Sequence, residues 1–173
     1  MNFFYCSISS IDTLSFFCHN REKGEKRGFK MESSFKILLV DDQQIVLDGL
    51  KKQLNWSRFN GLICGCISDG AEAINFLQTC RPDVIISDIK MPHMDGLELS
   101  RRAKEENPAL QIVIFSGYSD FSFAQEAIRY GVTEYILKPV NPDDFHKVIQ
   151  KAEKEIDRRK KKESQEIKEK NFL

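Results

Sequence analysis

The segment Val84-Ile85-Ile86-Ser87-Asp88 is the clearest indication of the fold of this chain. It follows the helix-breaking Pro82, and its run of branched apolar residues is typical of a strand that is buried on both faces. Four further short apolar runs predict strands at residues 37–40, 62–67, 112–115 and 134–137. Uninterrupted runs of this kind, without polar alternation, favour a parallel sheet covered on both sides.

The longer stretches between these runs have apolar residues at helical spacing. They predict helices at residues 44–54, 71–79, 97–105 and 121–130, and a last helix that begins at residue 142. Five strand–helix pairs with short connections predict an α/β fold, a doubly wound five-stranded parallel sheet with helices on both faces. In such a sheet ligands bind at the edge formed by the carboxyl ends of the strands.

The charge of the chain is unevenly distributed. Its 173 residues include 26 Lys and Arg and 26 Asp and Glu, for a net charge of zero. Residues 1–30 have a net charge of +2, residues 31–150 of −5 and residues 151–173 of +3. The chain is long enough for one domain with a core, and its acidic body argues against a protein that binds nucleic acid with its whole surface.

These boundaries divide the chain into three parts. Residues 1–30 are expected to be a disordered or mis-assigned extension, with Met31 as the true start, because the residues after Met31 lead directly into the first strand. They do not resemble a signal peptide, since the first 20 residues contain no Lys or Arg. Residues 31–150 form the predicted domain, and residues 151–173 a charged helical linker or tail. No apolar run reaches the roughly 18 residues of a membrane span.

The five cysteines point to the cytoplasm, because an odd number without a secretion signal indicates reduced thiols. Cys64 and Cys66 are two residues apart in a predicted strand, so we expect them on the same face as small buried side chains. A metal site at this pair would need further ligands, and none has suitable spacing.

Polar residues gather where the predicted strands end. Asp41 and Asp42 follow the first strand, Asp88 ends the third, Ser116 the fourth and Lys138 the fifth. Three neighbouring carboxylates repel one another unless a cation joins them, and such hard oxygen ligands suit Mg²⁺. A serine and a lysine opposite the ion can hold phosphoryl oxygens. The chain lacks a Gly-rich nucleotide-binding loop, so the site predicts a phosphoryl group carried on a carboxylate.

These motifs resemble the receiver domain of bacterial two-component response regulators. The resemblance covers residues 31 to about 151, and its motifs are Leu38-Leu39-Val40-Asp41-Asp42, residues 82–96, Ile114-Phe115-Ser116-Gly117 and Tyr135-Ile136-Leu137-Lys138-Pro139. The residues around the last two motifs are similar to receivers attached to AraC-type DNA-binding domains. The expected fold is therefore the flavodoxin-like receiver fold.

The resemblance implies a role for each residue at the strand ends. Asp88 is implied to be the phosphoacceptor, which takes a phosphoryl group from a phosphohistidine of a sensor histidine kinase. Mg²⁺ is implied as the cofactor, with Asp88 and Asp42 as direct ligands, Asp41 acting mostly through water and the backbone carbonyl of Lys90 completing the set. Such a domain is a signalling switch rather than an enzyme, and catalyses only its own phosphorylation and dephosphorylation.

The remaining residues are implied to read out the phosphorylation. Ser116 and Lys138 would each bind a phosphoryl oxygen, and the bond between Lys138 and Pro139 is expected to be cis. Tyr135 is at the aromatic switch position, expected to turn inward as Ser116 moves. This movement would change the surface of the fourth helix, fifth strand and fifth helix, which could also form a homodimer. Gly96 is expected to shape the loop beside the site.

Other interpretations of these residues stay open. Asp41 could cap the following helix, and Tyr135 could be an ordinary half-buried aromatic side chain. The whole chain could be a phosphorylation-independent interaction module on the receiver fold, a stand-alone receiver or part of a transcription regulator. Residues 151–173 lack the apolar pattern of a recognition module, so we expect no direct nucleic-acid binding by this chain. The basic run 158–162 is interpreted as a solvated helix extension or linker.

Overall fold

The predicted parallel sheet is present in the computed structural model, which describes residues 35–53, 56–59, 61–117 and 121–170. The expectations for residues 1–30 and for Met31 lie outside these ranges. The strands are β1 (Phe35–Val40), β2 (Gly61–Ile67), β3 (Val84–Ser87), β4 (Gln111–Ser116) and β5 (Glu134–Leu137). All pair in parallel, in the order β2-β1-β3-β4-β5, which confirms the predicted doubly wound sheet.

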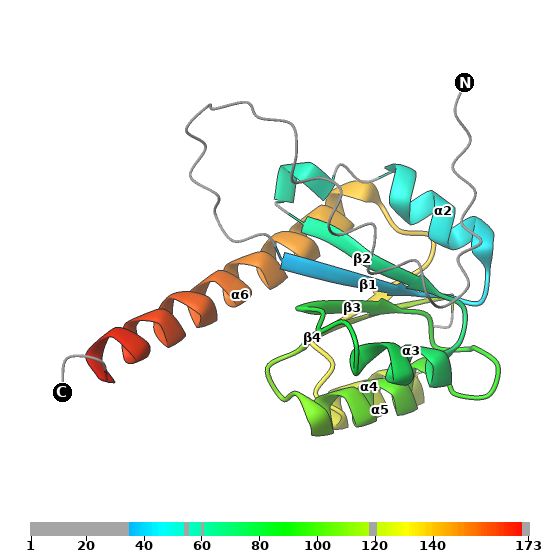
Figure 1. Ribbon diagram of the computed structural model, residues 1–173. Helices are drawn as coiled ribbons and strands as arrows, with labels where there is room; N and C mark the ends of the chain where they lie inside the picture. Colours follow the sequence, from blue (N-terminus) through cyan, green and yellow to red (C-terminus); the bar gives the residue numbers. More distant parts are fainter. Residues whose placement is uncertain (1–34, 54–55, 60, 118–120, 171–173) are drawn as a thin grey trace. The chain divides into compact units, whose positions relative to one another are not determined.

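Helices cover both faces of the sheet, as Figure 1 shows. They are α2 (Gln44–Gln53), the 3-10 helix η2 (Trp56–Phe59), α3 (Gly70–Leu77), α4 (Gly96–Glu106), α5 (Phe121–Arg129) and α6 (Pro142–Lys170). Alternate strand residues point to opposite faces, so Ile37 and Leu39 of β1 pack with α2 and α6, whereas Leu38 and Val40 pack with α3 and α4. A smaller apolar cluster joins α4 to α5.

Short polar side chains begin several of these helices. The Asp69 carboxylate accepts hydrogen bonds from the backbone N–H groups of Ala71 and Glu72 at the start of α3. Asp95 does the same for Glu98 at the start of α4, at 2.7 Å. These caps satisfy N–H groups that have no partner within the helix, and so fix the residue at which each helix begins.

The expected common orientation of Cys64 and Cys66 is wrong. A β-bulge interrupts the pairing of β2 with β1, since Ile37 pairs with Ile63 but Leu38 pairs with Gly65. The extra residue reverses the alternation of side chains, so Cys66 packs on the α2 and α6 side and Cys64 on the α3 and α4 side. Neither forms a disulfide within the described part of the chain, and burial, with Cys80 beside it, raises the pKa of the Cys64 thiol.

Two further features differ from the sequence-based prediction or extend it. The short helix η2 was not predicted, and it buries Trp56 and Phe59 against α6. The last helix, α6, is a single helix of 29 residues. Among the described residues, no helix is both long and apolar enough to span a membrane.

Candidate functional site

The predicted site lies where two neighbouring strands, β1 and β3, end at the same edge of the sheet. The chain leaves these strands in opposite directions, which makes their ends the topological switch point of the fold. Asp41 follows β1 and Asp88 follows β3, and both are buried. Their backbone N–H groups bond to Ile67 and Val40 respectively, at 3.0 and 2.9 Å, which holds both residues in the extended line of the sheet.

Lys138 joins the two carboxylates. Its Nζ lies 2.9 Å from Asp41 Oδ2 and 2.8 Å from Asp88 Oδ1, although the lysine follows β5, two strands away from β3. The Lys138 backbone N–H bonds to the Ser116 carbonyl at 2.7 Å, and the peptide bond to Pro139 is cis, as the resemblance implied. One ammonium group therefore serves two buried carboxylates.

Backbone groups hold the other oxygen of each carboxylate. The N–H of Gln43 donates to Asp41 Oδ1 at 2.9 Å, and the N–H of Lys90 donates to Asp88 Oδ2 at 3.0 Å. Each carboxylate is thus fixed by one backbone donor and by Lys138. Because a carboxylate has about four lone-pair positions, each can still accept another ligand.

The charges of the site perturb one another. Burial raises the pKa of Asp88, and the nearby Asp41 carboxylate adds to this effect, while Lys138 opposes it. Burial alone would lower the pKa of Lys138, but its hydrogen bonds to Asp88 and Asp41 outweigh burial and raise it. Lys138 therefore stays protonated and serves as the countercharge of the site.

The remaining predicted residues surround this cluster. Ser116 is buried at the end of β4, beside β3 and β5. Asp42 is exposed and makes no hydrogen bond or ion pair with any residue the structure describes. Tyr135 is half-buried and packs against the cluster between α4 and α5. The structure thus joins Asp41 and Asp88 through Lys138, and Ser116 ends β4, the strand between those of Asp88 and Lys138. Asp42, the third carboxylate expected to converge here, does not take part in this contact.

The donor set fits Mg²⁺ in its chemistry. Within the described ranges no three Asp, Glu, His or Cys side chains are arranged closely enough to hold a metal ion. Asp41 and Asp88 nevertheless converge on one cationic group, Lys138, and the exposed Asp42 directly follows Asp41. Carboxylate oxygens are hard donors, and Mg²⁺ binds to proteins through one or two of them.

Sequence reasoning missed two contacts of the site. Lys138 Nζ lies 4.8 Å from the centre of the Phe115 ring, a distance suited to a cation–π interaction. The backbone N–H of Gln43, which orients Asp41, was also not foreseen. The aromatic residue directly before Ser116 could have indicated the first contact. The second contact depends on the path of the backbone after β1, which the sequence pattern does not indicate.

Gly96 shapes the loop beside the phosphoacceptor candidate, as expected from the sequence. Its N–H bonds to the Ile89 carbonyl at 2.7 Å, and a Cβ atom at this position would lie 1.9 Å from the carbonyl oxygen of Asp88. No residue other than glycine fits without moving the backbone of Asp88.

A doubly wound parallel sheet in the order β2-β1-β3-β4-β5, with two carboxylates and a lysine at its switch point, belongs to the flavodoxin-like class of folds. Comparison with known protein families shows to which family the chain belongs. Residues 37–150 match the response regulator receiver domain, and the chain belongs to this family.

Two relatives of the chain are named transcriptional regulatory proteins. The chain is 36% identical over 124 residues to the uncharacterized transcriptional regulatory protein YesN of Bacillus subtilis (strain 168), covering 72% of this chain and 34% of that protein. It is 32% identical over 107 residues to the transcriptional regulatory protein HptR of Staphylococcus aureus (strain NCTC 8325 / PS 47), covering 62% of this chain and 42% of HptR. The chain thus spans less than half the length of these relatives.

Solved structures agree with this family. The REC domain of AraT, a response regulator from Geobacillus stearothermophilus, has a TM-score of 0.69 and 35% identity, covering 73% of this chain and 98% of that one. A two component transcriptional regulator AraC from Clostridium phytofermentans ISDg has a TM-score of 0.66 and 28% identity, covering 75% and 99%. The resemblance to receivers of AraC-type regulators is therefore confirmed.

Proposed function

We propose that this receiver is a phosphoryl-accepting switch in which Asp88 takes a phosphoryl group from a phosphohistidine of a sensor histidine kinase. The observation that carries the proposal is the contact of Lys138 with both Asp41 and Asp88 at the switch point of the sheet. A lysine fixed beside a buried carboxylate can offset the negative charge of a transferring phosphoryl group, and the second acid is available as a ligand for Mg²⁺.

In the proposed reaction an Asp88 carboxylate oxygen bonds to phosphorus while the phosphorus–nitrogen bond of the phosphohistidine breaks. The N–H of Lys90, which bonds Asp88 Oδ2, holds the carboxylate in place during this step. Lys138, 2.8 Å from Asp88 Oδ1, is positioned to bind a phosphoryl oxygen on that carboxylate. Ser116, at the end of β4, is the proposed partner of another phosphoryl oxygen.

The site carboxylates Asp41, Asp42 and Asp88, with the backbone carbonyl of Lys90, are the groups that would hold Mg²⁺. When bound, the ion would offset negative charge on the phosphoryl group. The expected chemistry is confined to phosphorylation and dephosphorylation of this protein itself, so the receiver acts as a switch rather than on a separate substrate.

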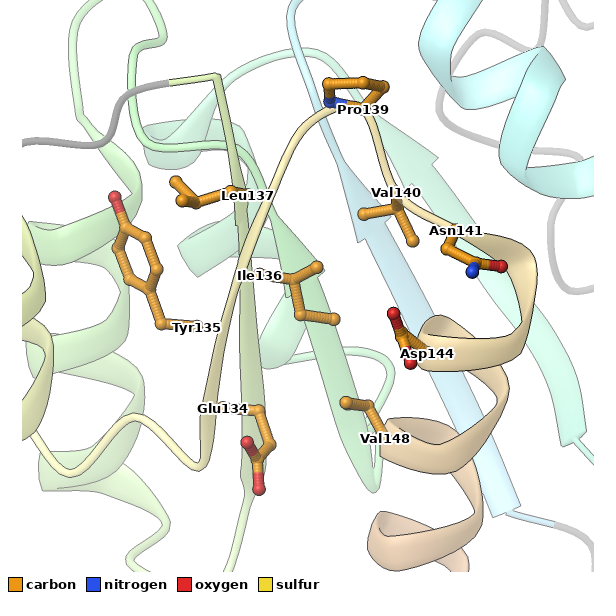
Figure 2. Close-up of a pocket in the computed structure, with 9 residues that line it drawn as sticks. All are labelled: Glu134, Tyr135, Ile136, Leu137, Pro139, Val140, Asn141, Asp144 and Val148. Atoms are coloured by element: carbon orange, nitrogen blue, oxygen red, sulfur yellow. The ribbon is translucent and has the colours of Figure 1, made fainter.

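The proposed output surface is formed by α5, β5 and α6, the fourth helix, fifth strand and fifth helix expected from the sequence. Figure 2 shows Tyr135 on the opposite side of β5 from Ile136 and Val148, and Tyr135 packs toward α5. A groove of about 460 Å³ lies between β5 and α6. Movement of Ser116 and Tyr135 would alter this surface, which we propose as the site of homodimer formation.

The wider setting follows from the relatives. Since YesN and HptR are named transcriptional regulatory proteins, we infer that the output is transcription regulation through a DNA-binding domain that residues 31–173 do not supply. We place the receiver domain at residues 31–150. We place the protein in the cytoplasm, which suits a kinase partner and three cysteines that form no disulfide within the described residues, Cys64, Cys66 and Cys80. Direct nucleic-acid binding by this chain is not expected.

The test is intact-protein mass spectrometry after incubation with Mg²⁺ and acetyl phosphate. We expect the wild type to gain one phosphoryl group and Asp88→Asn to gain none. Asp48→Asn, which removes a half-buried acid of α2 paired with Lys51 and outside the site, serves as the matched control and should be phosphorylated normally. Omission of Mg²⁺ should abolish the gain. An unmodified wild type, or equal modification of Asp88→Asn, would favour the phosphorylation-independent interaction module instead.

A further inference from the structure

The last helix, α6, stays in contact with the receiver beyond the residues that match the family. The match ends at residue 150, whereas α6 continues to Lys170. Ile156 is 1% exposed and belongs to the same apolar cluster as residues of β1, β3 and β4. The core of the domain therefore includes a residue that was expected from the sequence to lie in the linker.

Asp83 provides a second anchor, at the edge of the sheet opposite to the phosphoryl site. Its backbone N–H donates to the Lys36 carbonyl at 2.9 Å, and its backbone carbonyl accepts from Gln111 at 3.0 Å. Its carboxylate Oδ2 accepts from the Lys36 N–H at 2.9 Å. Asp83 is thus held by β1 and β4 independently of its contacts with α6, and its carboxylate is largely buried.

Two cations of α6 converge on this carboxylate. Arg159 Nη2 lies 3.1 Å from Asp83 Oδ1, and Lys160 Nζ lies 3.4 Å from Asp83 Oδ2. Arg159 also donates through Nη1 to the Ala109 carbonyl at 2.7 Å, in the segment before β4. The guanidinium therefore bridges two segments of the sheet edge with separate N–H groups, a geometry that a lysine cannot reproduce.

The basic run 158–162 accordingly divides between two faces. Arg158 is exposed and pairs with Glu155 of its own helix, at 2.8 Å. Arg159 and Lys160 are only partly exposed and turn to Asp83, whereas Lys161 and Lys162 are exposed. A uniformly solvated linker would not place two of five consecutive cations on one largely buried carboxylate.

We propose that Asp83, Arg159 and Lys160 form a clasp that extends the rigid receiver to about residue 163 and fixes the direction in which α6 leaves it. α6 begins at Pro142, shortly after Lys138, and Figure 1 shows it running along the sheet and beyond it. The helix is thus attached both near the phosphoryl site and at the opposite edge of the sheet. A helix held at two points transmits a movement of one end to the other, whereas a flexible joint at residue 151 would absorb it.

Hydrogen exchange of the full chain, followed by mass spectrometry, tests the clasp. In the wild type we expect amides to stay protected to about residue 163 and to exchange rapidly beyond it, because backbone N–H groups of a helix report on its opening. Arg159→Gln should lower the protection of residues 157–163 about ten-fold, because it removes both the ion pair and the bond to Ala109. Arg158→Gln, the neighbouring cation paired on the exposed face, should leave it unchanged.

Two further variants separate the clasp from general destabilisation. Arg159→Lys keeps the charge but not the two-segment contact, and should show an intermediate loss of protection. In Asp83→Asn, the additional Arg159→Gln change should lower protection of residues 157–163 far less than it does in the wild type. Protection that ends near residue 151 in the wild type, or equal effects of Arg159→Gln and Arg158→Gln, would overturn the proposal. The result does not depend on phosphorylation.

Discussion

The ammonium group of Lys138 lies between two carboxylates that would otherwise face each other at the ends of β1 and β3. Asp41 and Asp88 are buried, so each needs a cation or enough donors to offset the lost hydration. The backbone N–H groups of Gln43 and Lys90 supply one donor each and no net charge. At the scale of single residues, the stability of the site therefore depends on Lys138.

We expect Lys138→Gln to lower the free energy of unfolding by about 2 kcal/mol at neutral pH, because it leaves two buried carboxylates without a countercharge. Adding Asp88→Asn to this variant should restore part of the loss, since it removes one of the two charges. Urea unfolding followed by the fluorescence of the buried Trp56 measures both. Lys147→Gln, which removes an exposed cation paired with Asp144, should produce no measurable change. A further loss on adding Asp88→Asn would contradict this account.

The backbone beside the phosphoacceptor candidate depends equally on one residue, Gly96. A Cβ atom there would lie 1.9 Å from the Asp88 carbonyl oxygen, so Gly96→Ala must displace backbone and should destabilise the protein by about 2 kcal/mol or more. Gly49 lies inside α2, and a Cβ atom at this position would meet nothing within 4 Å. Gly49→Ala should therefore stabilise the protein by up to about 1 kcal/mol, because alanine has the higher helix propensity. Thermal unfolding of the two variants checks both signs.

At the scale of elements, the sequence predicted most of the fold, because each strand is a continuous apolar run and each helix has apolar residues at helical spacing. Val84–Ser87 shows this for a strand that is buried on all sides. The bulge in β2 was not predicted, because the alternation of side chains along a strand does not show that one residue, Cys64, is extra. The short helix Trp56–Phe59 escaped because four residues are too few to show a helical period.

The same scale gives a prediction for α6, whose apolar positions become sparse after residue 152. Ile156 is 1% exposed and Ile167 is 60% exposed on the same helix. We expect Ile156→Ala to lower the free energy of unfolding by about 2–4 kcal/mol, because it opens a cavity in the core. Ile167→Ala should change it by less than about 0.5 kcal/mol. Equally small effects of the two substitutions in chemical unfolding would show that Ile156 is not part of the core.

At the scale of the whole molecule, contacts between distant residues were the part that sequence reasoning could not supply. Lys138 meets Asp41 across 97 residues, and Arg159 meets Asp83 across 76. The carboxyl ends of parallel strands share one edge of the sheet, which predicted that the residues at the strand ends converge: Asp41, Asp42, Asp88, Ser116 and Lys138. In the structure the side chains of Asp41, Asp88 and Lys138 do so in direct contact. The positions of the strand ends do not indicate which side chains pair. The contact of Arg159 with Asp83 could not be predicted, because the arginine lies within a run of five cations that the sequence does not distinguish.

The arrangement of exposed apolar side chains leads to a prediction about self-association. On the proposed output surface, Ile128 of α5 is 76% exposed, and Phe121 lies two helical turns before it with similar exposure. Large apolar side chains exposed together on one helix face mark an interaction site more often than isolated ones do.

We expect the wild type with Mg²⁺ and beryllofluoride to sediment as a dimer, and Ile128→Lys to weaken the association about ten-fold or more. Ile45→Lys, at a residue 80% exposed on α2 and outside this surface, should dimerise normally. Only Ile128 belongs to the surface that phosphorylation is proposed to change. If both variants dimerise as the wild type does, the dimer does not form through Ile128 of α5. If both fail to dimerise although each binds beryllofluoride, the association is not specific to this surface.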